Sequence, residues 1–241
     1  MIKNREKYGI KVPNNVKEAL LLDLQNNNHL WAEAIAKEMG ALNNEKCFKY
    51  HPSHHKLPST FQFAPLRMIF DIKKEDFRRK TRLVAGGHVV NASMFESYSS
   101  VVQTKSLRML QTIALNEGLD LMTADVGNAF IQAYTNEKIY SRCGKEFGEK
   151  EGCIVEIKKA LYGLSKSARQ WSLELGDKLR TMCFWPSRAD PDLWIRMADD
   201  ETHYEYIATH VDDLIIASKN PDRYIEILKE NYPLRHVEKK P

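Results

Sequence analysis

Three aspartates carry the clearest potential for chemistry in this sequence. Asp212 and Asp213 are adjacent inside an apolar, β-prone stretch, residues 206–217, and Asp125 ends another short apolar stretch. The first stretch is typical of a β-hairpin with an acidic turn. Adjacent carboxylates repel each other and favour a cation between them, and hard oxygen ligands suit Mg²⁺ or Mn²⁺. Taken alone, an Asp-Asp pair is more often a polar turn than a metal site.

The segment around Asp125 strengthens the interpretation as a metal site. A short strand is predicted to end at Asp125, Gly127 follows, and Ala129 and Phe130 begin a helical turn. A carboxylate at a strand end, next to an Asp-Asp hairpin, could complete a two-metal site. Two metals can hold the attacking and leaving oxygens of an in-line phosphoryl displacement. We therefore expect Asp125 to converge with the Asp-Asp turn on one face of a sheet.

Three motifs give the sequence a resemblance to a known family. They are Val211-Asp212-Asp213, the run Asp125-Val126-Gly127-Asn128-Ala129-Phe130, and the run from Ala160 to Trp171, ALYGLSKSARQW. In this order and at about this spacing, they resemble the reverse transcriptase of Ty1/copia-type retrotransposons, the RNA-directed DNA polymerase domain of the Pol polyprotein. The resemblance covers roughly residues 29–233.

The resemblance implies a nucleotidyltransferase that adds a dNTP to a primer 3′-hydroxyl with two Mg²⁺ or Mn²⁺ ions. By resemblance, Asp125 and Asp212 ligate the metals, Asp213 supports them, and the Val126 carbonyl adds a neutral ligand. The implied partner is an RNA or DNA template with its primer, in a cytoplasmic virus-like particle or in the nucleus. Another palm-type nucleotidyltransferase or a cyclase would share the carboxylates but not the segment at 162–163.

A basic segment, residues 66–90, concentrates the positive charge. It has seven Lys and Arg against three Asp and Glu, so its excess of four equals the net charge of +4 of the whole chain. Such a segment is a candidate phosphate contact, and a solvated hairpin face is the alternative. By resemblance, Arg82 holds the nucleotide triphosphate and Lys73 or Lys74 supplies a second contact; Gly86 stands where the family usually has a lysine.

Five further site residues come from the resemblance. Phe130 would exclude a ribose 2′-hydroxyl by its bulk, although core packing is the simpler interpretation of a phenylalanine from sequence alone. Tyr162 and Gly163 match the segment that lines the nucleotide site. His210 replaces the tyrosine usual before Val-Asp-Asp, so that His210 and Val211 are expected near the primer terminus.

The resemblance implies an α+β fold with a right-hand architecture. Residues 60–241 would form fingers, about 60–120, and a palm with an antiparallel sheet, about 119–241, after helices and an irregular lead-in at 1–59. The chain ends at Pro241, before the thumb and RNase H that usually follow. A catalytically inactive remnant that folds and binds nucleic acid is therefore the alternative. We expect the isolated chain to extend a primed RNA template slowly or not at all.

Periodicity and capping residues predict the supporting elements. We expect a helix from a cap at Asn14 or Asn15 to about Leu24. Further helices are expected at 30–39 with a stop at Gly40, from a cap at Thr104 or Ser106 to Gly118, at 166–182 and at 220–231. Strands are expected at 66–73, 77–84, 139–142, 154–158, 193–197 and 204–211, and an irregular segment at 41–63.

Composition indicates a globular protein that does not enter a membrane. The chain is 43% hydrophobic and 28% charged, and no apolar run approaches the roughly 20 residues of a membrane span. No signal segment is recognisable at the start. The four cysteines form no CxxC pair, which argues against a zinc framework. The oligomeric state is open at this level.

Overall fold

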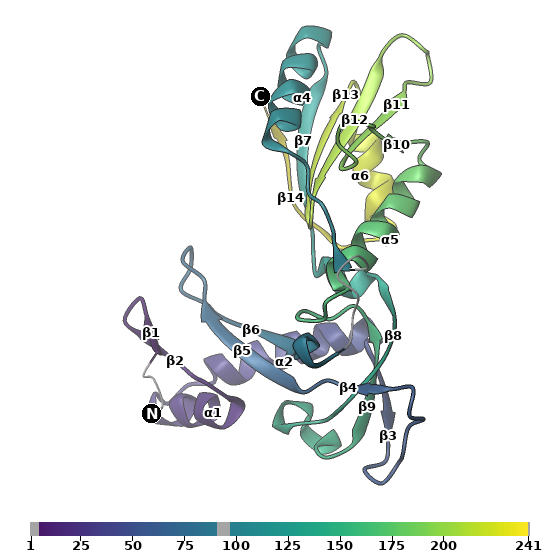
Figure 1. Ribbon diagram of the computed structural model, residues 1–241. Coiled ribbons are helices and arrows are strands. Elements are labelled where there is room, and N and C mark those ends of the chain that lie inside the picture. The colour runs from purple at the N-terminus through teal and green to yellow at the C-terminus, as the bar shows by residue number, and fades with distance from the viewer. Residues whose placement is uncertain (1–4, 91–96, 241) are drawn as a thin grey trace. The chain divides into compact units, whose positions relative to one another are not determined.

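The computed structural model describes residues 5–90 and 97–240 (Figure 1). The chain divides into two compact units, and each is built from two stretches: unit 1 from residues 1–97 and 133–167, and unit 2 from residues 98–132 and 168–241. The N-terminal helices thus belong to the same unit as the basic hairpin. Within the described residues, each helix is too short or too polar to span a bilayer.

Unit 2 is built on a six-stranded antiparallel sheet. Across the sheet the order is β10 (Trp185–Pro186), β11 (Leu193–Met197), β12 (Tyr204–His210), β13 (Asp213–Ser218), β7 (Asp120–Val126) and β14 (Leu234–Lys240). Helix α5 (Ser167–Thr181) lies between β7 and β12 along the chain, and α6 (Pro221–Lys229) between β13 and β14. The chain order β7-α5-β12-β13-α6-β14, with β14-β7-β13-β12 across the sheet, is a split βαβ arrangement.

Helix α4 (Thr104–Glu117) covers one face of this sheet. Leu110 and Ala114 pack against Tyr206, Ala208 and Ala217, all of them buried. Because side chains alternate between the faces of a strand, the neighbouring residues point to the other face, where α6 contacts β7 and β13. Both faces of the sheet are therefore packed, which fixes the register of its strands.

Unit 1 combines helices with three small sheets. It contains the hairpin β1 (Arg5–Lys7)–β2 (Ile10–Val12), α1 (Val16–Gln25), α2 (Leu30–Asn44) and the hairpin β5 (Leu66–Ile72)–β6 (Arg79–Ala85). A four-stranded sheet has the order β3 (Phe48–His51), β9 (Ile154–Lys159), β8 (Tyr134–Arg142) and β4 (Gln62–Phe63), with β4 parallel to β8. The ring of Trp31 on α2 meets Phe70 of β5 edge-on, 5.6 Å between centroids.

Several sequence-based expectations about the limits of helices and strands were wrong. Helix α2 does not stop at Gly40 but continues to Asn44, because Leu42, 2% exposed, extends its buried stripe. The segment expected to be irregular contains β3 and β4, whose partner strands β9 and β8 lie far away along the chain, with Phe48 paired to Ile157 and Gln62 to Ile139. Helix α4 is not capped by Thr104 or Ser106; its N-cap residue is Gln103.

The acceptor at the start of α4 comes from a distant loop. The Gln103 N–H donates to Asp190 Oδ2 at 2.9 Å, and the Asp192 N–H donates to Asp190 Oδ1 at 3.2 Å. Burial raises the pKa of the Asp190 carboxyl, but hydrogen bonds from Ser106, Gln103 and Asp192 outweigh it, and the net pKa lies below the usual value. Asp190 therefore ties α4 to the segment that leads into β11.

Candidate active site

The predicted acidic hairpin is present in unit 2. Strand β12 ends at His210, Val211 and Asp212 form the turn, and β13 begins at Asp213, which pairs with His210. The side chains of His210 and Asp213 are exposed, and those of Val211 and Asp212 are partly exposed. The two adjacent carboxylates therefore lie at the solvent-facing end of the sheet.

Two hydrogen bonds hold this turn. Val211 has a φ of 59°, in the left-handed region that β-branched residues rarely adopt. The indole Nε1–H of Trp171 donates to the Val211 carbonyl at 2.6 Å, and the Val126 N–H donates to the Asp212 carbonyl at 2.7 Å. Because Trp171 is 1% exposed and Val126 is fully buried, both donors are fixed by the core. A strained backbone conformation of this kind persists only where the surrounding contacts hold it in place.

Asp125 lies beside the turn. Strands β13 and β7 pair so that Asp213 is directly opposite Asp125. Directly opposite residues on antiparallel strands project to the same face, with Cβ atoms roughly 4.5–5.5 Å apart. Leu121 and Ile215, which occupy that same face, pack on the α4 cluster. The structure thus brings Asp125 and Asp213 together on one face, with Asp212 next to them in the turn.

Electrostatics of the three carboxylates favour a cation. Burial raises the pKa of Asp213, the negative charges of Asp212 and Asp125 raise it further, and His210 partly offsets them. A divalent cation would relieve this repulsion, and carboxylate oxygens suit Mg²⁺ or Mn²⁺. Among residues 5–90 and 97–240, however, no group of three or more His, Cys, Asp or Glu side chains is arranged to hold a metal ion. The three aspartates thus supply carboxylate oxygens suited to a divalent cation, but these oxygens are not arranged as a preformed metal site.

Strand β14 adds a residue that the sequence interpretation missed. Arg235 pairs with Asp125 from the side opposite to Asp213. Its guanidinium lies over Gly127, since a Cβ atom at that glycine would come within 2.7 Å of Arg235 Nε. The segment 234–240 has no apolar alternation that would predict a strand. Its charge fits an edge strand, where charged side chains discourage further pairing.

In unit 1, three of the predicted nucleotide-binding residues lie together. Arg82 is on the exposed face of β6, with its guanidinium carbon 5.1 Å from the centroid of the Tyr162 ring. The Ala85 N–H donates to the Tyr162 carbonyl at 2.8 Å. Gly163 has a φ of +90°, and an added Cβ would lie 2.1 Å from the Ala85 carbonyl oxygen. Only glycine fits there, and its close approach holds Tyr162 against β6.

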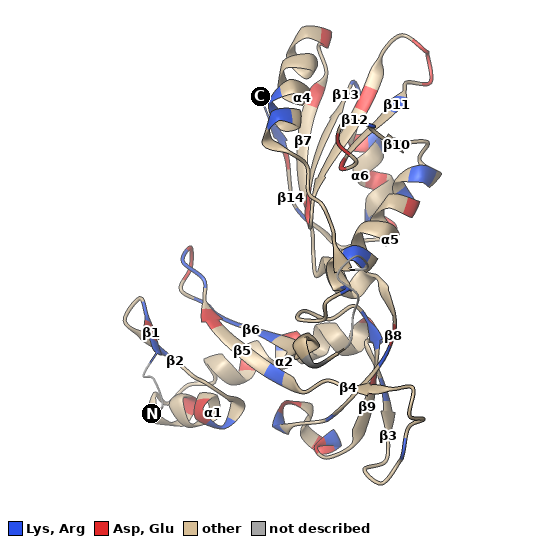
Figure 2. Ribbon diagram, viewed as in Figure 1, with Lys and Arg blue, Asp and Glu red and all other residues tan. Residues whose placement is uncertain are grey.

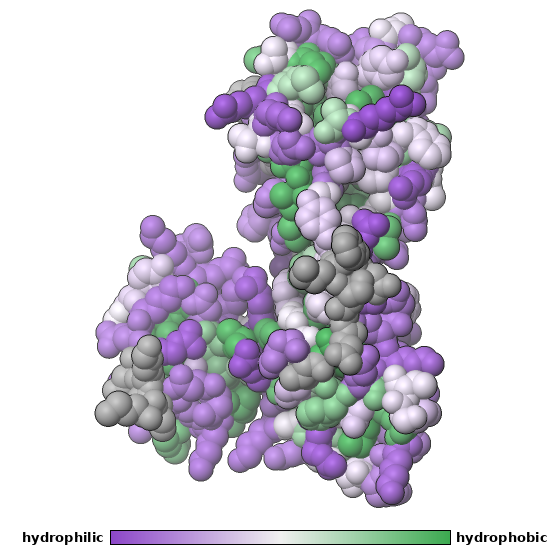
Figure 3. All heavy atoms as spheres, in the orientation of Figure 1, coloured by the Kyte–Doolittle hydropathy of each residue, from purple (hydrophilic) through white to green (hydrophobic). Residues whose placement is uncertain are grey.

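Lys73 and Lys74 lie elsewhere, at the β5–β6 turn. Arg82 pairs with Ile69, four residues before Lys73, so the turn lies roughly 13 Å further along the hairpin. Lys and Arg gather on β6 and the turn, whose surface is hydrophilic (Figures 2 and 3). Lys80 lies on β6 with Arg82, where burial lowers its pKa and the nearby positive charges of Arg82, Lys73 and Arg78 lower it further.

Phe130 belongs to unit 2, like the carboxylates. It lies in the 3₁₀ turn η2 (Ala129–Gln132), shortly after the end of β7. Its side chain is partly exposed, unlike the neighbouring Ala129 and Ile131, which are buried. Phe130 is therefore not a fully buried core residue.

Comparison with known proteins gives one family and a set of relatives. The family described as "Reverse transcriptase (RNA-dependent DNA polymerase)" matches residues 53–236. The chain is 28% identical over 199 residues to the retrovirus-related Pol polyprotein from transposon RE1 of Arabidopsis thaliana, covering 79% of this chain and 13% of the polyprotein. It is 26% identical to the corresponding polyprotein from transposon TNT 1-94 of Nicotiana tabacum, covering 78% and 14%. The chain thus spans a small part of these relatives.

A yeast polyprotein is a further relative by sequence, whereas the similarity to a solved structure is low. The transposon Ty1-DR4 Gag-Pol polyprotein of Saccharomyces cerevisiae is 27% identical over 170 residues, covering 68% of this chain and 10% of the polyprotein. Among solved structures, a foamy viral protease-reverse transcriptase in complex with double-stranded DNA aligns with a TM-score of 0.40 and 13% identity, covering 84% of this chain and 30% of that chain.

Proposed function

We propose that this chain, which belongs to the reverse transcriptase family, supplies the polymerase active site of a Ty1/copia-type Pol polyprotein. The observation that carries the proposal is the register that sets Asp125 opposite Asp213 beside the Asp-Asp turn. The proposed reaction is template-directed transfer of a nucleotide from a dNTP to a primer 3′-hydroxyl. The partners are then a primed RNA or DNA template and dNTP.

Asp125 and Asp212 are the proposed ligands of two Mg²⁺ or Mn²⁺ ions, with Asp213 in support and the Val126 carbonyl as a neutral ligand. When bound, such ions lower the pKa of the primer hydroxyl and neutralise the triphosphate and the departing pyrophosphate. The chain's own part is positioning. Trp171 and the Val126 N–H hold the turn, and a fixed carboxylate geometry matters because small misplacements cost large rate factors.

Arg82 is the proposed triphosphate contact. A guanidinium stacked on an aromatic ring keeps its N–H donors at its edge, where they can bind phosphate oxygens bidentately. Tyr162 and Gly163 would line the same nucleotide site. Lys73 or Lys74 is proposed as the second phosphate contact, from the turn of the hairpin.

Phe130 is the proposed gate against ribonucleotides, and His210 and Val211 are proposed to lie at the primer terminus. In polymerase terms, the split βαβ unit would be the palm and the β5–β6 hairpin would belong to the fingers. The ranges about 60–120 and 119–241 are proposed for fingers and palm, although residues 133–167 pack within unit 1.

Primer extension tests the proposed function. Because the chain spans 13% of the RE1 polyprotein, the assay uses the chain alone and a chimera in which it replaces its matched segment of that polyprotein. We expect the chimera to extend a labelled DNA primer on an RNA template with dNTP and Mg²⁺, and Phe130→Val to admit rNTP. A folded chimera that binds primed template but extends it with neither Mg²⁺ nor Mn²⁺ would contradict the proposal.

A further inference from the structure

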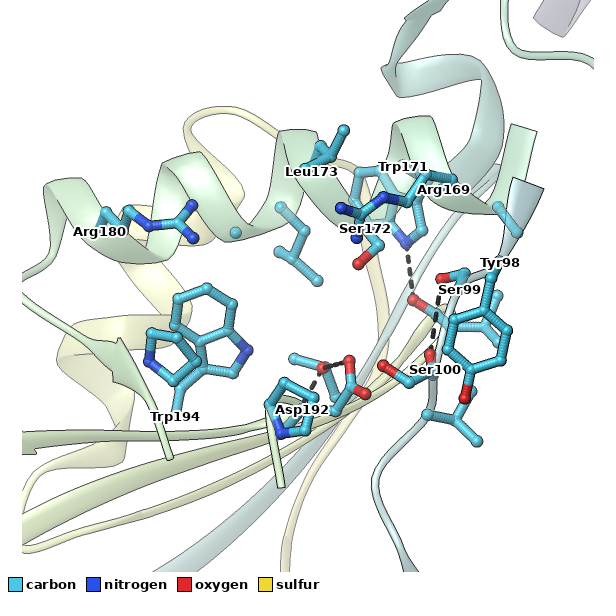
Figure 4. Close-up of a pocket in the computed structure, with 18 residues that line it drawn as sticks. Tyr98, Ser99, Ser100, Arg169, Trp171, Ser172, Leu173, Arg180, Asp192 and Trp194 are labelled. Carbon is cyan, nitrogen blue, oxygen red and sulfur yellow. Dashed lines mark hydrogen bonds between the residues drawn. The ribbon is translucent and has the colours of Figure 1, made fainter. Parts of the chain in front are cut away.

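A cavity of about 380 Å³ lies in unit 2 between helix α5 and the strands β11 and β12 (Figure 4). Its volume falls within the range of small-molecule sites, roughly 300–1,000 Å³. The walls include the indoles of Trp171 and Trp194, the aliphatic Leu175 and the rings of Pro186 and Pro191. These apolar and aromatic walls are interrupted by polar side chains, among them Ser100, Ser172, Asp192 and Thr209.

Asp192 is the polar group that the fold does not satisfy. Its side chain is more than nine-tenths buried, and it lines the cavity between Trp194 and Ser100 (Figure 4). Oδ1 lies 3.5 Å from Thr209 Oγ1, a weak contact. Oδ2 is buried and has no hydrogen-bond partner among residues 5–90 and 97–240. An unpaired buried carboxylate oxygen is unfavourable, so a donor that reached Oδ2 would gain an unusually strong bond.

The other charges of the cavity do not reach Asp192. Among the described residues that line it, Asp192 is the one acid, and Arg169 and Arg180 are the two bases. Arg180 is paired with Asp177 at 2.9 Å and lies over the Trp194 ring, 5.3 Å from its centroid. Arg169 is exposed on α5, where solvent and salt screen its charge. The buried end of the cavity therefore carries the negative charge of Asp192, and solvent and salt screen the positive charges at its rim.

We propose that this cavity binds a small planar aromatic molecule that carries a cationic N–H donor, such as an amidinium. The ring would lie beside the indole of Trp194, next to Trp171. Because Oδ2 is buried, the lining has to shift slightly for the ligand N–H to donate to Asp192 Oδ2. A donor–acceptor pair with charge on both sides gives a bond roughly twice as strong as a neutral one. The proposal does not depend on polymerase activity.

The cavity adjoins the turn that carries the aspartates. Val211 is one of its lining residues, and the Trp171 indole N–H donates to the Val211 carbonyl. A ligand against Trp171 therefore contacts the group that holds this turn. The same indole N–H is a direct reporter of occupancy, and the indole of Trp194 is a second one.

Nuclear magnetic resonance of the indole N–H groups tests the proposal with three matched probes. Benzamidine carries a cationic donor, benzamide a neutral donor and benzoate an anionic acceptor on the same ring. We expect benzamidine to shift the Trp171 and Trp194 signals saturably, benzamide to bind about tenfold more weakly, and benzoate not to bind. Trp31 and Trp185, which do not line the cavity, serve as internal references.

Asp192→Asn removes the charge at nearly constant shape, and we expect it to weaken benzamidine binding about tenfold or more while changing benzamide binding little. Asp222→Asn, an exposed position on α6, is the matched control and should change neither. Equal binding of benzamidine and benzoate, unchanged benzamidine affinity in Asp192→Asn, or no saturable shift at Trp171 and Trp194 would each overturn the proposal. Should Asp192→Asn not fold, the three probes on the unaltered protein decide alone.

Discussion

The acidic turn of unit 2 and the basic hairpin of unit 1 are both antiparallel hairpins with a charged surface, yet they are held very differently. Strand β13 has β12 on one side and β7 on the other, and two hydrogen bonds from buried donors fix the turn. Strands β5 and β6 pair only with each other in the described residues, and the tip at 74–78 is exposed. Position is therefore specified closely at the acidic turn and loosely at the tip of the basic hairpin, although the strands of that hairpin are anchored on α2, where the Leu83 N–H donates to Glu38 Oε1 at 3.0 Å.

This difference matches what each surface is proposed to do. Ligands of a catalytic metal must keep a fixed geometry, and mutually repelling carboxylates keep it only on a rigid support. Attraction of a phosphate needs charge more than geometry, and exposed cations provide it at a distance. Arg82 is intermediate between a rigidly held ligand and an exposed cation. Its guanidinium lies over the ring of Tyr162, which the close packing of Gly163 against Ala85 holds at the base of the hairpin.

The largest effect expected on the acidic side is from Asp212→Ala. In the primer-extension chimera it should lower the rate about a thousandfold or more, because it removes a metal ligand at the reacting centre. Asp200→Ala, in the exposed loop between β11 and β12, is the matched control and should stay near the unaltered rate. A comparable loss in both variants would show that the acidic turn has no special role.

The next largest effect is expected from removing the hydrogen bond that supports the acidic turn. Trp171→Phe removes the donor to Val211 and part of a core contact with Tyr232, whose ring centroid is 5.3 Å away. We expect a loss of about 2–3 kcal/mol in the free energy of unfolding, measured by denaturant titration. Trp185→Phe, at a position 62% exposed, should change it by less than about 0.5 kcal/mol. Equal losses in the free energy of unfolding for the two variants would show that the hydrogen bond from Trp171 does not stabilise the turn.

On the basic side, Arg82→Ala should weaken binding of Mg²⁺–dNTP about tenfold or more, measured by calorimetry. The same charge removed at exposed Arg5 should have no measurable effect. Lys74→Ala at the turn should weaken binding less than Arg82→Ala, since an exposed cation is screened. If the loss at Lys74 matched that at Arg82, the turn of the hairpin and not its base would be the main phosphate contact.

The smallest effect concerns the repulsion among the carboxylates. Because the pKa of Asp213 is raised in the folded protein, its carboxyl ionises at a lower pH when the chain is unfolded. Stability should therefore fall as the pH rises from the unfolded pKa to the folded pKa, and stay level above it. Asp213→Asn should remove this fall and stabilise the protein at neutral pH by about 0.5 kcal/mol, after allowance for solvent screening.

Thermal unfolding of both proteins between pH 3 and 8 measures this difference. Added Mg²⁺ should narrow the gap at neutral pH by stabilising the unaltered protein. A variant that is less stable than the unaltered protein at neutral pH would show that Asp213 makes favourable contacts and not repulsive ones.

Local patterns in the sequence were enough for the parts of the site that lie within one segment. Short β-prone runs around a polar turn predict the β5–β6 and β12–β13 hairpins, and Asn15 and Gly118 mark helix ends that the structure has. The Gly118 φ of 64° shows why glycine ends α4.

Features that depend on distant pairing could not be predicted in this way. Strand β14 is charged and lacks apolar alternation, so its pairing with β7, and hence Arg235 beside Asp125, is visible only in the folded sheet. The same holds for the capping of α4 by Asp190 and for the indole of Trp171 at Val211. The resemblance of segment 160–171 to the family singles out its residues, but it does not show which backbone atom each of them contacts.

The most direct test of the account is where a divalent cation binds. Mn²⁺ broadens the amide signals of nearby residues, so a titration of ¹⁵N-labelled protein locates it without any need for activity. We predict that the signals of Asp125, Val126, Asp212 and Asp213 broaden at the lowest Mn²⁺ concentration, and that the double variant Asp125→Asn/Asp212→Asn loses this broadening. Broadening that begins at the loop of residues 199–201, unchanged in the double variant, would contradict the assignment of the metal site.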